Sequence, residues 1–184
     1  DIPEMFLANS NGIYIVDVMT GNILKFIVYD SYNGVTLCIG QFDSDPSLEA
    51  GMDSGDIIDI ETGQVQWTTG NFMSCLQSSD VDQDGMDELV GKVLSSLTVY
   101  DVDENNIKWS VPDHKRTNLV RICDFGADGN PDIVTGTDWD YSRFTCFNGA
   151  NGTEIWQCDT TVENFNDVYV ADVDMDSADE LVVC

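Results

Sequence analysis

The feature that most constrains this chain is an acidic run that recurs along it. The run reads DVDQDGMDELVGK at 80–92, DFGADGNPDIVTG at 124–136 and DVDMDSADELVVC at 172–184. Counted from its first residue, each run has an acid at position 9, and these acids are 44 and then 48 residues apart (Glu88, Asp132 and Glu180). Such a period indicates an array of repeated units rather than one irregular globule.

Two weaker copies extend the array toward the N-terminus. The segment FDSDPSLEAG at 42–51 reads as a shortened run that keeps Asp43, Asp45 and Glu49, and DIPEMFLA reads as the end of a run closed by Glu4. From Glu4 to Glu180 the chain advances 176 residues, or four repeats averaging 44. We therefore expect one repeat domain over 1–184, divided at about 1–34, 35–70, 71–114, 115–160 and a partial 161–184.

A second landmark lies midway through each repeat. It reads DVMTGNILKF from 17, DIETGQVQW from 59, DVDENNIKW from 101 and NGANGTEIW from 148. A glycine or asparagine followed by apolar–polar alternation predicts a β-hairpin, because these residues tolerate the positive φ of a tight turn. Equivalent tryptophans follow three of the turns (Trp67, Trp109 and Trp156), which favours packing between repeats over a sugar-binding platform.

Each repeat contains enough alternating segments for four short strands, as in LVRIC, DIVTG, RFTCF and EIWQC of residues 119–158. Helical periodicity is absent. The expected fold is all-β, a β-propeller-like array of about four four-stranded antiparallel blades, with an acidic loop joining the first two strands of each. By this count the chain starts at the second strand of one blade and ends at the second strand of another. It is therefore either an excerpt of a longer propeller or a subunit whose surplus strands pair with a neighbour.

The acidic loops place oxygen atoms at alternate positions, which suits calcium, a cation that takes six to eight hard oxygen ligands. An EF-hand is excluded, because its last glutamate stands at position 12 between two helices, whereas strand residues follow position 9 here. The candidate ligands are Asp80, Asp82, Asp84, the Met86 carbonyl and Glu88 in the first loop; Asp124, Asp128, the Asn130 carbonyl and Asp132 in the second; and Asp172, Asp174, Asp176, the Ala178 carbonyl and Glu180 in the third.

These loops resemble the calcium loops of FG-GAP/VCBS propeller repeats, found in integrin α-chain heads and in secreted bacterial proteins. The hairpins resemble blades of pyrroloquinoline-quinone-like propellers. The resemblance implies a radial array of blades in which calcium pins the turn between each blade's first and second strands. Three places depart from the pattern and have incomplete ligand sets: Gly126 at position 3 of the second loop, the shortened loop at 43–49, and the truncated loop at Asp1.

The net charge of the chain excludes some classes of binding partner. The chain has 34 acids against 7 bases, a formal net charge of -27. Such a surface repels nucleic acid and anionic lipid, so we expect neither nucleic-acid binding nor membrane insertion. A halophile's solvation coat would explain the acids, but not the regular loop spacing.

Two further features point to an extracellular protein. Six cysteines without zinc-type spacing allow three disulfides in an oxidising compartment, with reduced core cysteines as the alternative. The sequon NGT makes Asn151 a candidate glycosylation site at a hairpin tip.

Catalytic motifs are missing from the sequence. There is no serine elbow or HExxH motif, and the single histidine, His114, lies in a polar linker. Quinone dehydrogenases of similar architecture close about twice as many blades around their cofactor. We expect a secreted, non-catalytic, calcium-stabilised structural or adhesive protein that self-assembles head to tail through its terminal strands. The alternative is a carbohydrate- or protein-binding module, of lectin or receptor type, excerpted from a longer chain.

Overall fold

The computed structural model describes residues 3–30, 36–70, 74–112, 119–137, 143–159 and 168–183. Over these ranges the regular structure is β throughout, in seventeen strands that form five sheets. Each sheet consists of strands consecutive in the sequence, and neighbouring strands pair antiparallel. In the described part of the chain no helix is long and apolar enough to span a membrane.

Three of the five sheets have four strands each. They are β4 (Leu37–Gly40), β5 (Glu49–Met52), β6 (Asp56–Asp59) and β7 (Val65–Thr68); β8 (Ser74–Ser79), β9 (Glu88–Val93), β10 (Ser96–Asp101) and β11 (Asn106–Pro112); and β12 (Leu119–Cys123), β13 (Asp132–Thr137), β14 (Arg143–Asn148) and β15 (Glu154–Asp159). The first sheet has three strands, β1 (Glu4–Asn9), β2 (Gly12–Asp17) and β3 (Ile23–Val28), and the last pairs β16 (Val168–Ala171) with β17 (Glu180–Val183).

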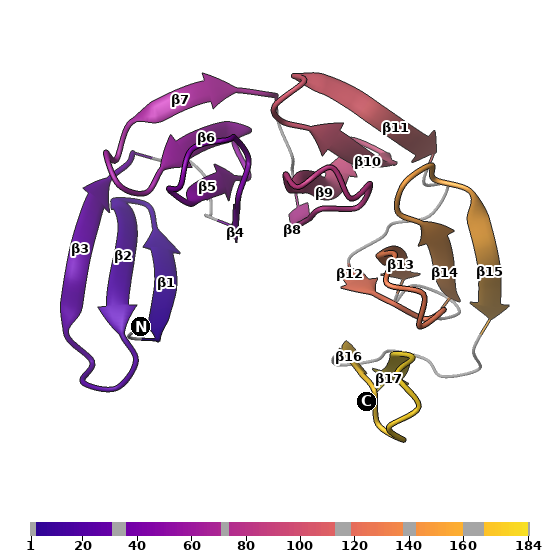
Figure 1. The fold of residues 1–184 in the computed structure, drawn as a ribbon. Coiled ribbons are helices and arrows are strands. Elements are labelled where there is room, and N and C mark those ends of the chain that lie inside the picture. Colours follow the sequence, from indigo (N-terminus) through magenta and orange to yellow (C-terminus); the bar gives the residue numbers. More distant parts are fainter. Residues whose placement is uncertain are drawn as a thin grey trace.

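The sheets follow one another around an open arc (Figure 1). Strands β4, β8, β12 and β16 line the inside of the arc, where β8 contacts β4 and β12, and β12 contacts β16. Strands β3, β7, β11 and β15 lie outermost (Figure 1). The prediction of an all-β array of four-stranded antiparallel sheets is confirmed. Among the described residues the array does not close: the first sheet has three strands beginning with β1, and the last sheet pairs β16 with β17.

The predicted hairpin turns are present between the last two strands of the sheets. The residues at their tips have left-handed backbones, with φ of 71° at Gly21, 71° at Gly63, 55° at Asn105 and 69° at Gly152. Glycine and asparagine adopt this conformation with the least steric cost. The local sequence therefore determines where each sheet turns toward its outer strand.

Apolar side chains pack between consecutive sheets. One cluster joins Phe42 and Ile57 of the second sheet to Leu76 and Leu89 of the third, and Trp67 packs against it. Trp109 and Trp156 pack against the next two clusters along the arc. Trp109 also donates from Nε1 to the Gly149 carbonyl, 2.6 Å away, in the following sheet. The tryptophans thus hold neighbouring sheets together, in agreement with the packing interpretation.

The three-disulfide prediction is wrong for the cysteines that the structure describes. Cys38, Cys75, Cys123, Cys146 and Cys158 are all free thiols, and Cys184 lies outside the described residues. Cys38, Cys75 and Cys123 belong to the successive inner strands β4, β8 and β12, and burial raises the pKa of Cys38 to about 12. A thiol in such an environment stays protonated and packs as a small apolar side chain.

Candidate cation sites

The acidic loops lie between the first and second strands of a sheet, and in each the acid at position 9 begins the second strand. This acid turns back over its own loop and accepts the backbone N–H of the residue at position 2. Glu49 accepts from Phe42 at 2.7 Å, Glu88 from Val81 at 2.8 Å, and Glu180 from Val173 at 2.8 Å. The closing carboxylate is therefore held over its own loop, where Glu49 and Glu88 are buried and Glu180 is partly exposed.

The acid at position 1 gathers the loop from the opposite side. Asp80 accepts the N–H groups of Asp84 and Gly85, each at 3.0 Å. Asp124 and Asp172 accept backbone hydrogen bonds from the equivalent parts of their own loops. Successive N–H groups pointing at one carboxylate require a tight turn, which Gly85 permits with a φ of 100°.

Three groups of three carboxylates result, each with oxygen atoms within 4.8 Å of one another. We call them the carboxylate triads: Asp43, Asp45 and Glu49; Asp80, Asp82 and Glu88; and Asp172, Asp174 and Glu180. The second and third triads come from loops predicted as calcium sites, and they use positions 1, 3 and 9 of those loops.

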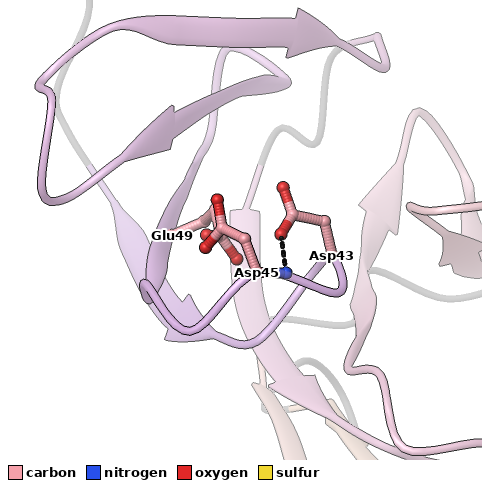
Figure 2. Close-up of side chains that lie close together, drawn as sticks. All are labelled: Asp43, Asp45 and Glu49. Carbon is pink, nitrogen blue, oxygen red and sulfur yellow. Dashed lines mark hydrogen bonds between the residues drawn. The ribbon is translucent and has the colours of Figure 1, made fainter.

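The first triad corrects the interpretation of the 42–51 loop as a shortened copy. Counting back from Glu49 places Gln41 at position 1, so the loop has full length and lacks only the first acid. The side chains of Asp43, Asp45 and Glu49 converge, and Asp43 accepts the backbone N–H of Asp45 at 2.8 Å (Figure 2). An alignment on the closing acid, rather than on the first one, would have found this site from sequence.

The remaining predicted ligands are placed differently. Asp124, Asp128 and Asp132 form no triad among the described residues, because Gly126 supplies no carboxylate at position 3. Asp84 and Asp176 lie outside the triads and each accept a backbone N–H at 2.9 Å, from Met86 and Ala178. Those two residues, with Asn130, stand at position 7, where the carbonyl was predicted as a ligand. The truncated loop at Asp1 lies outside the described residues.

Burial of the closing glutamate makes the first two triads electrostatically costly, whereas the third is largely exposed. Glu49 is 0% exposed and Glu88 is 1% exposed. Burial, reinforced by the neighbouring aspartates, raises the pKa of both glutamates to about 7. Within the described structure, Glu49 Oε1 and Asp82 Oδ1 have no hydrogen-bond partner. Orphaned carboxylate oxygens beside other carboxylates fit a hard cation, and the all-oxygen donor set fits calcium in particular.

Lys108 distinguishes the second triad from the other two. Its ammonium contacts the carboxylate of Asp82 and lies 3.6 Å from Glu88 Oε1. It also pairs with Asp101 at 3.2 Å. Although burial opposes its charge, these acids raise the pKa of Lys108. This contact could not be predicted from the sequence, because Lys108 comes from the outer strand of the sheet.

Two other predicted features lie away from the triads. Asn151 is exposed in the turn between β14 and β15, where its Oδ1 accepts the N–H of Thr153 at 2.9 Å. His114 lies outside the described residues. Glycosylation of Asn151 stays a prediction.

Comparison with known proteins establishes the fold and no more. No protein-family model and no curated protein matches the chain. Its structure is similar to the crystal structure of the V. cholerae biofilm matrix protein Bap1, with a TM-score of 0.63 and 16% identity over 86% of this chain and 26% of that one. It is also similar to Kuenenia stuttgartiensis hydrazine synthase, with a TM-score of 0.62 and 14% identity over 90% of this chain and 49% of that one.

The chain thus spans about a quarter and about half of the two proteins it resembles in structure. The FG-GAP/VCBS resemblance has no matching family model behind it and stays a prediction. Since a biofilm matrix protein and a hydrazine synthase share this fold, the function of this chain must be argued from its own loops.

Proposed function

We propose that this chain is a calcium-stabilised, non-catalytic module of an extracellular structural or adhesive protein, built as part of a β-propeller. The observation that carries the proposal is the buried Glu49, whose Oε1 lacks a hydrogen-bond partner among the described residues and whose carboxylate lies within 4.8 Å of those of Asp43 and Asp45. A divalent cation in each triad would join the two strands that flank the loop. It would also neutralise carboxylates that otherwise repel one another.

A structural role is supported by hydrogen bonds that link successive loops. Asp87, at position 8 of its loop, accepts from the backbone N–H of Gln41 at 2.9 Å and donates its own N–H to the Gln41 carbonyl at 2.7 Å. Asp179 makes the same pair of bonds with Asp124, at 2.8 and 3.0 Å. Ordering one loop around a cation would therefore help to order its neighbour along the arc.

The extracellular assignment draws on calcium supply and on one structural relative. Extracellular calcium modules bind with a Kd of about 10⁻⁴ to 10⁻³ M, so their sites fill outside cells and not in the cytosol. Bap1 is described as a biofilm matrix protein, which is the kind of setting that we propose for this chain.

Self-assembly is the proposed mode of action. Strand β1 pairs only with β2 among the described residues, which leaves its other edge as a template for a strand of another copy. A β16–β17 pair from a second chain would extend that sheet, and a contact that repeats without closing forms a filament. The second candidate is a monomeric module that binds a glycan or an extracellular protein.

Two measurements test the proposal. Equilibrium dialysis against calcium should show bound metal in the wild type and one site fewer in Glu49→Gln. The matched control, Glu61→Gln, removes the same charge from an exposed hairpin and should bind as the wild type does. Absence of bound calcium at millimolar concentration would refute the metal role.

Light scattering in calcium and in EDTA then separates self-assembly from the monomeric binding module, since a monodisperse species of about 20 kDa in calcium would refute self-assembly.

A further inference from the structure

We propose that Lys108 competes with calcium for the second triad, so that the first and second triads differ in calcium affinity through the residue that each outer strand presents. The inference rests on the proposed calcium role. In the second triad the ammonium of Lys108 offsets part of the carboxylate charge, whereas the first triad has no such cation among the described residues.

The first support is the position of the ammonium. Lys108 Nζ contacts Asp82 and lies 3.6 Å from Glu88 Oε1, so it stands between two of the three acids of the second triad. Only 19% of the Lys108 side chain is exposed. A divalent cation bound by the same oxygens would have to displace the ammonium, because like charges in that space repel.

The second support is a β-bulge in the outer strand, which directs the Lys108 side chain toward the acidic loop. In β7, β11 and β15 the pairing with the preceding strand shifts by one residue near the hairpin turn, so that Gln66, Lys108 and Ile155 are β-bulges. Strand β3 has the same bulge at Leu24. A bulge bends its strand and redirects one side chain. Gln66 Nε2 donates to Asp43 Oδ2 at 3.2 Å, as Lys108 contacts Asp82, so both bulged residues reach the acid at position 3.

The third support is that the side chain at the bulge varies together with the residue at position 3 of the acidic loop in the same sheet. In the second and third sheets, where position 3 is Asp43 or Asp82, the bulge carries a polar or charged side chain that contacts this aspartate. In the fourth sheet position 3 is Gly126 and the bulge carries Ile155, which is 51% exposed. Both triads keep a carboxylate oxygen without a hydrogen-bond partner among the described residues, Glu49 Oε1 and Asp82 Oδ1, but the neutral Gln66 adds no positive charge to the first triad, whereas Lys108 adds one to the second. We therefore assign the tighter calcium site to the first triad.

Lys108 has a second ion-pair partner, which it can keep when calcium binds the triad. Asp101, 1% exposed, lies 3.2 Å from its ammonium and does not belong to the triad. The lysine would keep this partner after leaving Asp82 and Glu88. Without calcium, its contacts with Asp82 and Glu88 stabilise the 80–88 loop. At a sufficient calcium concentration, the metal displaces the ammonium from these two carboxylates.

The test exchanges the two bulged residues in the full chain, with calcium binding measured by competition with a chromophoric chelator. Lys108→Gln should tighten the second site by about tenfold or more, which corresponds to about 1.4 kcal/mol. Gln66→Lys should weaken the first site by a similar factor. Lys108→Arg keeps the charge and should tighten the second site far less than Lys108→Gln does. Lys25→Gln removes a lysine from outer strand β3 and controls for net charge.

The outcomes separate the two claims. If the wild type binds calcium and neither exchange changes any affinity, the competition is refuted and the calcium role stands. If no variant binds calcium, the proposed function fails. Should Lys108→Gln be unfolded in calcium, the Gln66→Lys result decides: an unchanged first site overturns the inference, and a weakened one upholds it.

Discussion

Replacing Glu49 by glutamine should stabilise the calcium-free protein, although it removes a fully buried carboxylate. Glu49 is 0% exposed, and its Oε2 accepts the N–H of Phe42 at 2.7 Å. A glutamine can keep this acceptor. What it removes is the negative charge that burial and the nearby aspartates, Asp43 first among them, make unfavourable.

The magnitude follows from the pKa. Burial raises the pKa of Glu49 from 4.5 to about 7, so the native state binds this proton more tightly than the unfolded chain does. The stability contribution of the group is present below pH 4.5 and is lost as the pH rises toward 7. At about 1.4 kcal/mol per pH unit, the ionised group costs about 3 kcal/mol at pH 8. In a protein of this size, that corresponds to roughly 6 to 12 °C in Tm.

The assay is urea and thermal unfolding in EDTA, followed by tryptophan fluorescence, at pH 8 and at pH 5. Glu49→Gln should raise stability at pH 8 by up to about 3 kcal/mol and by much less at pH 5, where the glutamate is already protonated. In saturating calcium the order should reverse, because the variant lacks a ligand. Glu61→Gln, the exposed control, should shift neither curve. A variant that is destabilised equally at both pH values in EDTA would refute the reasoning.

Three other changes test separate parts of the structure. Gly126→Asp should add a calcium site to the 124–132 loop, since a Cβ there would meet only Asp128 at 3.4 Å; unchanged stoichiometry in dialysis would contradict this. Trp109→Phe removes the Nε1 bond to Gly149 and should cost about 1 kcal/mol equally with and without calcium in urea unfolding, whereas a calcium-dependent cost would place Trp109 in the cation system. Thiol titration should count at least the five described cysteines in urea and far fewer, more slowly, in the native protein; a lower count in urea would indicate disulfides.

Local chemistry made much of this fold predictable. The Asp-x-x-x-Gly hairpins around Gly21 and Gly63 turn where the sequence places a residue that accepts positive φ. In the loops at 80–88 and 172–180 the acids at positions 1, 3 and 9 lie together, since the strand that follows position 9 fixes the closing glutamate, whereas the acid at position 5 lies outside the group. In these cases the residues that decide the structure are neighbours in sequence.

The missed features all depend on residues distant in sequence or on alignment. Lys108 reaches the second triad from a strand twenty residues beyond Glu88, through a bulge that the sequence alone does not mark. The first triad was obscured by Gln41, which replaces the acid by which the other loops are recognised. The disulfide prediction failed because the number and spacing of the cysteines do not show where each lies in the fold. Cys38, Cys75 and Cys123 lie on three separate inner strands and are free thiols.

The most direct test of the central claim is the thermal unfolding of the wild-type chain in calcium and in EDTA, with magnesium as the control. At ten times its Kd, calcium should add about 1.4 kcal/mol for each filled triad. Two filled triads would then raise the Tm by roughly 6 to 12 °C above the EDTA value. Magnesium should do far less, because it needs a smaller, octahedral site. A Tm that is the same in calcium and in EDTA would contradict the account, because calcium in the triads would then add nothing to the stability of the fold.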